Sequence, residues 1–149
     1  MPLFEWTTTI SRSADDVFDF LSRPANLVAV SPPEFHMQLL DGPERLHLGA
    51  RVVLQGRRWG VSQRIVSEVT AYQPSTTLID EQREGPFKKW IHTHQLEPIP
   101  GGTHMLDRIE YEAPGGLLGM LLSNARIEEE LKEIFQFRTQ KFKESLEEN

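Results

Sequence analysis

Two histidines one residue apart, His92 and His94, are the side chains in this sequence best suited to chemistry. They lie in a stretch, Phe87 to Glu97, whose pattern predicts a β-strand. Side chains two positions apart on a strand point to the same face, and here that face also carries Trp90 and Leu96. The opposite face is mainly polar. We therefore expect both imidazoles to point into the protein.

Two further predicted strands, Thr77 to Arg83 and Thr103 to Glu112, add polar residues to the same interior. On Thr103 to Glu112, the largely apolar face includes a carboxylate and a phenol. On Thr77 to Arg83, where the inward face is less clearly defined, polar groups are again expected inside. This is more polarity than an ordinary dry core holds, which indicates a functional interior. The expected interior polar residues are Asp80, Gln82, His92, His94, Asp107 and Tyr111.

Two imidazoles on one strand face with Asp107 on a neighbouring strand are the donor set of a two-histidine, one-carboxylate metal site. An H-x-H pair alone does not supply a third ligand at bonding distance. We therefore predict no metal and no other cofactor. Histidines that bond to neighbouring strands, or that line a ligand pocket, are the more frequent case.

General acid–base chemistry is the second use of these residues. A histidine with a pKa near 6.5 beside a carboxylate can remove a proton from carbon next to a carbonyl, as aldol cyclisation and dehydration require. The candidates are His92 or His94 as base and Asp107 to orient it, with Tyr111 or Arg138 to polarise the carbonyl. Equally, the same residues could only orient a ligand, so enzymatic activity stays open at this point.

A long amphipathic stretch, Leu117 to Leu146, predicts one C-terminal helix of about 45 Å with an apolar face to bury. Arg138 lies four residues from both Ile134 and Phe142, on the buried stripe. Its guanidinium then needs a partner: an internal carboxylate, solvent reached by snorkelling, or a ligand. Phe135 and Met105 are expected in the core or in a pocket wall.

The remaining elements predict a curved antiparallel sheet of about seven strands over which the long helix lies. Short, turn-rich connections between successive strands favour antiparallel neighbours, so the fold class is α+β in one domain, residues 1–149. The expected order is a strand (Leu3 to Ile10), two short helices (Ala14 to Leu21 and Ala25 to Val30), six strands (Phe35 to Leu40, Arg51 to Trp59, Val61 to Tyr72, Thr77 to Arg83, Phe87 to Glu97 and Thr103 to Glu112) and the long helix.

Composition excludes several classes of function. A net charge of -6 argues against binding to nucleic acid, whose backbone requires clustered Lys and Arg. The absence of cysteine removes disulfides, thiolate metal sites and a cysteine nucleophile. No stretch approaches the ~18 apolar residues of a membrane span, and residues 1–6 are unlike a secretory signal. We expect no integral membrane association and a cytoplasmic location.

The order of elements resembles the SRPBCC superfamily, whose START-like, helix-grip fold is shared by birch-pollen-type allergens and polyketide cyclases. More specific motifs are similar to bacterial ligand-binding members often labelled cyclase/dehydrase-like. They are Gly85-Pro86-Phe87, Trp90-Ile91-His92-Thr93-His94, Gly102-Thr103, Asp107, Tyr111, Pro114-Gly115-Gly116, and Ile134-Phe135 with Arg138. The resemblance covers essentially the whole chain and implies a cavity for a hydrophobic or amphipathic molecule between sheet and helix.

Three functions are consistent with these features. The one we favour is binding of a lipid, quinone, polyketide or similar molecule by a monomer or homodimer, and the alternatives are a cofactor-independent cyclase or dehydratase and an interaction or chaperone-type module. An enzyme should place a histidine beside both a carboxylate and open volume, whereas an interaction module should have a collapsed cavity and an exposed apolar patch near Leu117 to Leu122. The predicted ligand-contacting residues are Asp80, Gln82, Trp90, His92, His94, Met105, Asp107, Tyr111, Phe135 and Arg138.

Overall fold

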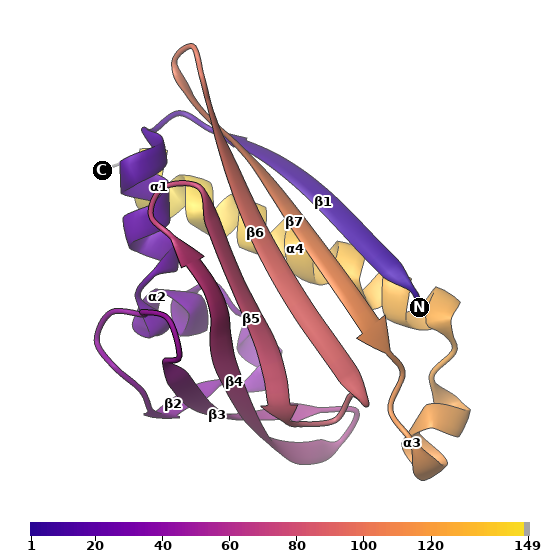
Figure 1. Ribbon diagram of the computed structural model, residues 1–149. Helices are drawn as coiled ribbons and strands as arrows, with labels where there is room; N and C mark the ends of the chain where they lie inside the picture. Colours follow the sequence, from indigo (N-terminus) through magenta and orange to yellow (C-terminus); the bar gives the residue numbers. More distant parts are fainter. Residues whose placement is uncertain (148–149) are drawn as a thin grey trace.

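A computed structural model describes residues 1–147 and contains one seven-stranded antiparallel sheet with the strand order β1-β7-β6-β5-β4-β3-β2 (Figure 1). The predicted α+β class is thereby confirmed. The elements are β1 (Leu3–Ile10), α1 (Ala14–Leu21), α2 (Pro24–Ala29), the 3-10 helix η1 (Pro33–Phe35), β2 (Gln38–Asp41), β3 (Arg51–Arg58), β4 (Val61–Gln73), β5 (Thr77–Glu84), β6 (Lys89–Ile99), β7 (Gly102–Glu112), α3 (Gly116–Leu121) and α4 (Asn124–Glu147).

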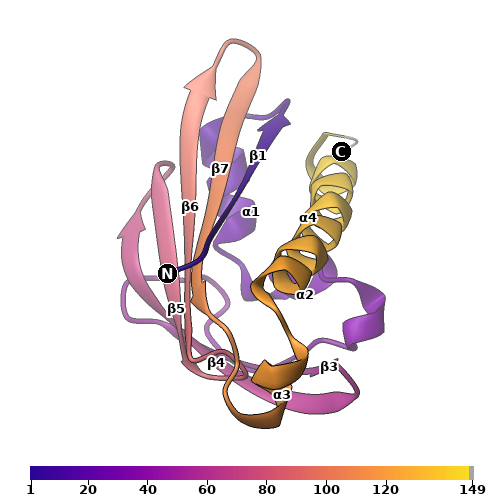
Figure 2. The ribbon, with the colours of Figure 1, turned by 90° about the vertical axis from the view of Figure 1, so that its right-hand side faces the viewer.

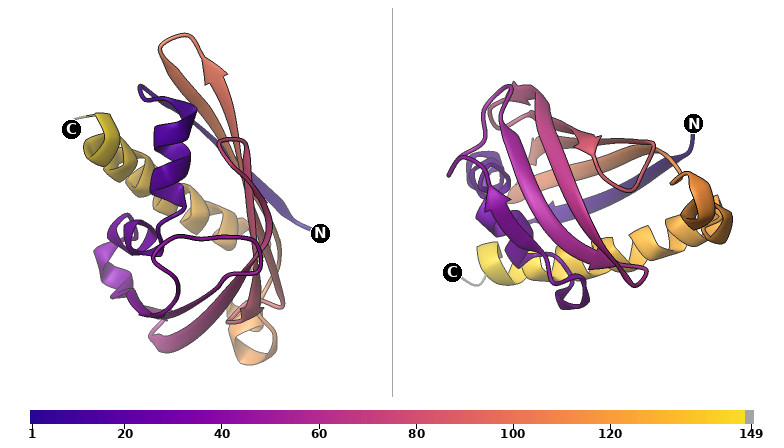
Figure 3. Two further views of the ribbon diagram at one scale, coloured as in Figure 1. Left: turned by 60° about the vertical axis from the view of Figure 1, so that its left-hand side comes forward. Right: turned by 90° about the horizontal axis from the view of Figure 1, so that it is seen from below.

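The sheet is strongly curved, and α4 lies on its concave side (Figure 2). Part of the curvature comes from β4, whose pairing with β5 shifts register between Val66 and Ser67 and again between Val69 and Ala71. Such irregularities bend a strand and increase its twist. Seen from below, α4 runs under the sheet from the side of α1 to that of α3 (Figure 3). The sheet thus forms a trough, and one helix fills it.

The predicted faces of β6 and β7 are confirmed. On β6 the side chains of His92, His94 and Leu96 are buried, and on β7 every second residue from Thr103 to Tyr111 is buried. The face of β5 is less sharply divided, because Leu78 is buried but residues 79–82 on both faces are all half-buried. Alternation therefore identified the residues that face α4.

The C-terminal helix is shorter than predicted. Leu122 adopts an extended conformation that separates α3 from α4, and Ser123 caps the new helix by accepting a hydrogen bond from the backbone N–H of Arg126 (3.1 Å). A serine at this position favours a helix start, because its hydroxyl pairs with a backbone donor that lacks a helical partner. The apolar run before Ser123 thus belongs to a separate short helix, in which Leu117, Met120 and Leu121 are 71–82% exposed.

Two further boundaries also differ. Proline 24 does not precede α2 but occupies its first turn, where proline lacks only an N–H that would be unpaired anyway. The strand predicted from Phe35 begins instead at Gln38, because Pro33–Phe35 forms a 3-10 turn that ends at His36 in a left-handed conformation (φ 46°). Neither shift moves a residue of the concave face of β6 or β7.

The core consists of two apolar clusters at opposite ends of the trough. One contains Ile10, Leu96, Met105, Phe142 and Leu146 among others, together with α1. The second contains Phe4, Phe87, Ile109, Leu131 and Phe135 among others. Between the two clusters, the side chains of β1, β6, β7 and α4 that face the interior are polar. A polar layer therefore crosses the middle of an otherwise apolar interior.

Candidate functional site

Each element that crosses the interior contributes to this polar layer, which consists of Thr8, Asp80, His92, His94, Asp107, Arg138 and Thr139. The strand register explains why the sheet residues meet. His94 lies opposite Asp107, and His92 opposite Asp80, in the antiparallel ladders. Directly opposed residues share a face at close range. The layer thus follows from register, which sequence alternation alone does not specify.

Asp107 is the centre of the layer. Its side chain is buried, and one oxygen, Oδ1, lies 2.8 Å from Nε2 of His92 and 2.9 Å from Nδ1 of His94. The contact with His92 is a well-aligned hydrogen bond. The contact with His94 has the distance of an ion pair but not the direction of a hydrogen bond, since Nδ1 has no hydrogen-bond partner within residues 1–147. The two imidazole rings stack with centroids 3.9 Å apart.

Asp80 extends the cluster towards β4. Its Oδ2 lies 3.7 Å from Nε2 of His94, and its Oδ1 accepts a 3.0 Å hydrogen bond from the hydroxyl of Ser67. His94 is thereby held between two carboxylates. Because the Asp80 side chain is 24% exposed, this end of the cluster is nearer to solvent than Asp107 is.

The two histidines differ in their affinity for a proton. Burial and the neighbouring charge of His94 lower the pKa of His92, and the hydrogen bond to Asp107 only partly offsets this. Burial also lowers the pKa of His94, but the carboxylates of Asp107 and Asp80 outweigh it, so that this pKa is raised. The proton of the cluster is therefore favoured on His94.

The carboxylates are held in their charged form. Burial raises the pKa of Asp107, but the two histidines lower it by more, so that the net pKa lies far below its usual range. Burial also raises the pKa of Asp80, but the nearby imidazoles of His94 and His92 and the hydrogen bond from Ser67 lower it by more, so that the net pKa is lowered. The buried charge of Asp107 thus requires positive charge close by.

Part of that charge comes from α4. Arg138 points from the helix towards the sheet, with its guanidinium carbon 4.9 Å from the centroid of the Phe135 ring. Burial lowers the pKa of Arg138, and the charges of Asp107 and Asp80 oppose that effect. Its Nη2 is buried and has no hydrogen-bond partner among the described residues. The predicted internal carboxylates therefore stabilise Arg138 through space without bonding to that nitrogen.

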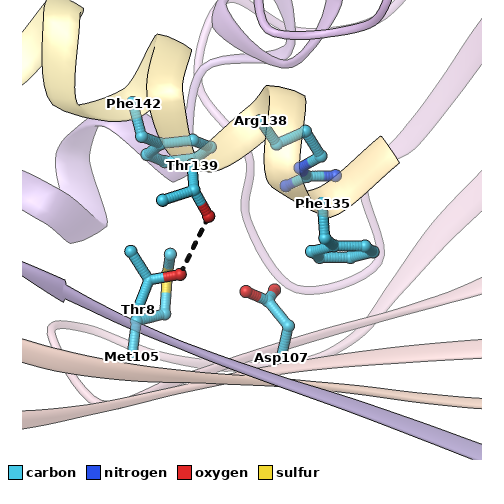
Figure 4. Close-up of a pocket in the computed structure, with 7 residues that line it drawn as sticks. All are labelled: Thr8, Met105, Asp107, Phe135, Arg138, Thr139 and Phe142. Atoms are coloured by element: carbon cyan, nitrogen blue, oxygen red, sulfur yellow. Dashed lines mark hydrogen bonds between the residues drawn. The ribbon is translucent and has the colours of Figure 1, made fainter. Parts of the chain in front are cut away.

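A small pocket separates Arg138 from Asp107 (Figure 4). The carboxylate of Asp107 points up from the sheet into it, and a pair of hydroxyls closes one side: Thr8 and Thr139 lie 3.3 Å apart, and Trp6 donates a 3.0 Å hydrogen bond to Thr139. Its volume, about 10 Å³ for the centre of a water-sized sphere, is room for about one water molecule. The residues lining it are Thr8, Met105, Asp107, Phe135, Arg138, Thr139 and Phe142.

The structure places the ten predicted residues in three groups. Met105, Asp107, Phe135 and Arg138 line the pocket, and Asp80, His92 and His94 lie behind Asp107. The others lie away from both: Trp90 and Tyr111 pack against Phe87 (ring centroids 4.7 and 6.0 Å apart), and Gln82 donates a hydrogen bond to the backbone oxygen of Phe87.

Sequence reasoning did not select Thr8, Thr139 or Phe142 as site residues. Phe142 was expected only on the apolar face of the helix. Thr8 follows Phe4 and Trp6 at two-residue spacing, so the alternation of β1 could have identified it. Thr139 lies beside the apolar stripe, where periodicity does not separate a site residue from a helix surface.

The potential ligand atoms of Asp80, His92 and His94 lie within 4.8 Å of one another, so these side chains could be drawn around a metal ion. Because an imidazolium cannot ligate a metal, an ion bound here would have to displace the proton that the flanking carboxylates favour on His94. Absence of a metal stays a prediction.

Comparison with known proteins identifies the family. Residues 1–147 match the family described as polyketide cyclase / dehydrase and lipid transport. The chain belongs to this family. The predicted resemblance to SRPBCC, helix-grip proteins is thus confirmed. Among curated proteins, none matches the sequence.

Solved structures agree in fold. Protein CV1439 from Chromobacterium violaceum superposes with a TM-score of 0.78 at 14% identity, covering 99% of each chain. Major latex-like protein 151 from Panax ginseng gives 0.71 at 14% identity over 97% of each chain, and Ara h 8.0201 gives 0.71 at 15% over 99% of each. At this identity the likeness concerns the polyketide cyclase/lipid transport fold alone. No helix of residues 1–147 combines the length and apolarity needed to cross a membrane.

Proposed function

We propose that this protein binds an amphipathic small molecule, such as a lipid, quinone or polyketide, between α4 and the concave face of the sheet. The polar group would lie in the polar layer between Arg138 and Asp107, and the apolar body would lie against Phe135, Phe142 and Met105. The observation that carries the proposal is the buried Nη2 of Arg138, a donor of a pocket-lining residue that has no hydrogen-bond partner in the described part of the chain.

The energetic reason is the cost of such a group. A buried donor without a partner loses its bonds to water and gains nothing in return, about 1–3 kcal/mol and more for a charged group. An oxygen of a ligand placed in the pocket would accept from Nη2 and recover part of that cost. The membership of a family that includes lipid transport supports an apolar body for this ligand.

Binding requires the pocket to widen, because its present volume suits about one water molecule. The flexible side chain of Met105 and the rings of Phe135 and Phe142 form the apolar part of its wall. The methionine side chain changes conformation at low cost. A shift of α4 away from the sheet would move the rings of Phe135 and Phe142 away from Met105. We expect the bound and free proteins to differ mainly in the distance between α4 and β7.

Native mass spectrometry of the protein purified from its own host tests the proposal. A stoichiometric small molecule released on denaturation is the expected result, and Arg138→Met should lower its occupancy. Arg126→Met on the exposed face of the same helix is the matched control and should retain the ligand. A wild-type protein that is always empty, and that takes up none of the lipids, quinones or polyketides offered to it, would contradict the proposal.

The interaction module is the second candidate, and two observations favour it. The pocket is small, and Leu117, Met120 and Leu121 of α3 are 71–82% exposed. The cyclase or dehydratase alternative has the 2.8 Å contact between His92 and Asp107 in its favour, but Asp107 and not the histidine faces the pocket. Replacing Met120 and Leu121 with Gln should leave ligand occupancy unchanged if binding at the pocket is the function.

A further inference from the structure

We infer that the polar group which enters the pocket is an uncharged hydroxyl, as in an alcohol, phenol or enol, and not a carboxylate or a phosphate. The inference rests on the proposed function and names the chemical class of ligand for the same site. It follows from two properties of the pocket: its one carboxylate is already matched by one guanidinium, and its wall presents both a donor and an acceptor.

Charge balance is the first argument. Of the residues that line the pocket, two are charged: Asp107 carries a carboxylate and Arg138 a guanidinium. One negative charge therefore already faces one positive charge across the pocket. An anionic ligand would add an unpaired charge beside Asp107 in a region of low polarity, and a buried charge without a partner is strongly disfavoured. An uncharged group leaves the balance unchanged.

Hydrogen-bonding capacity is the second argument. Every hydrogen bond and ion pair that the described residues make with Asp107 uses Oδ1, so Oδ2 is available as an acceptor. Across the pocket, Nη2 of Arg138 is a donor without a hydrogen-bond partner. A hydroxyl donates one hydrogen bond and accepts others, so one group can serve both residues. A carboxylate has no proton for Asp107, and a ketone can serve only Arg138.

The hydroxyls of Thr8 and Thr139 at the pocket wall do not discriminate between a ligand hydroxyl and a ligand carboxylate. Thr139 accepts from the indole N–H of Trp6, which leaves its own proton free for Thr8 or for a ligand oxygen. These groups are neutral and add no charge. Selectivity between a hydroxyl and a carboxylate therefore rests on Asp107 and on the charge balance of the pocket.

The test compares ligands that share a body and differ in the polar group. We would measure by calorimetry at pH 7 the binding of 2-naphthol against 2-naphthoate and of 1-dodecanol against dodecanoate. The inference predicts that each alcohol or phenol binds at least about tenfold more tightly than its carboxylate partner, since the like charge at Asp107 acts on the carboxylate alone. Tighter binding of either carboxylate would overturn it and leave the proposed function standing.

Two outcomes separate this inference from the proposed function. If none of the four compounds binds, and the protein from its host is also empty, the proposed function fails and the inference fails with it. If all four bind with similar affinity, the pocket binds amphipathic molecules but the inference about the polar group is wrong.

An Asp107→Asn variant tests the assigned cause. It should bring the affinities of 2-naphthol and 2-naphthoate together, because the repelling charge is gone. Glu133→Gln, on an exposed position of α4, makes the same change in net charge and should retain the wild-type preference. Circular dichroism at the assay temperature identifies a variant that does not fold, and the wild-type comparison of the four compounds stands without it.

Discussion

Replacement of Asp107 with Asn should destabilise the protein more than any other single change of charge in the polar layer. Asp107 is 1% exposed and is approached by His92 and His94 at 2.8 and 2.9 Å, so the substitution leaves the cationic side of a buried cluster without its nearest anion. Removing one partner of a buried pair costs about 3–5 kcal/mol. Asn has nearly the same volume and can still accept from His92, which recovers about 1 kcal/mol.

The expected loss in the free energy of unfolding is therefore about 2–4 kcal/mol. In a chain of this length it corresponds to a fall in Tm of about 5–15 °C. Urea unfolding at pH 7, followed by tryptophan fluorescence, measures it, and Glu133→Gln should change the free energy of unfolding by less than about 0.5 kcal/mol.

The dependence on pH supplies a second measurement of the same residue. Because the pKa of Asp107 is lowered on folding, its charge contributes stability above the ordinary aspartate pKa, about 3.9, and this contribution is lost as the pH falls through the folded-state value. The Asn variant should lose less stability than the wild type between pH 5 and the acid limit of folding. A cost below about 1 kcal/mol at pH 7, or an acid dependence identical to that of the wild type, would refute the electrostatic account.

Three other substitutions test separate parts of the reasoning. Thr139→Val leaves the indole N–H of Trp6 without its acceptor and should cost about 1–2 kcal/mol in urea unfolding, whereas a neutral result would show that this contact does not hold α4 to β1. Ser123→Ala removes the cap of α4 and should cost about 1 kcal/mol in the same assay; no change would contradict the capping role. The raised pKa of His94 contributes stability that is full below the ordinary histidine pKa, about 6.5, and is lost as the pH rises through the folded-state value. From pH 6.5 upward, the thermal stability of the His94→Gln variant should therefore fall less with rising pH than that of the wild type. An equal fall in both proteins would show that another group causes the pH dependence.

The secondary structure was largely predictable because it depends on local patterns. The bounds of β1 and α1 match the prediction, and the concave faces of β6 and β7 follow from the two-residue periodicity of strand side chains. The break between α3 and α4 was not predicted, because the apolar residues before Ser123 continue the helical spacing while pointing largely into solvent. Periodicity shows which residues share a side of a helix, but not whether another element covers that side.

The sequence by itself determined the fold class, the family and which polar residues of β6 and β7 face the interior, since each depends on residue order and on spacing along single elements. Only the tertiary structure decided how these residues meet. The register of β5, β6 and β7 brings His94 between Asp80 and Asp107. The position of α4 leaves Nη2 of Arg138, beside a pocket the size of a water molecule, without a hydrogen bond to any described residue. Distances across a layer depend on strand register and on how side chains pack between sheet and helix, and neither is encoded in the spacing of residues along one element.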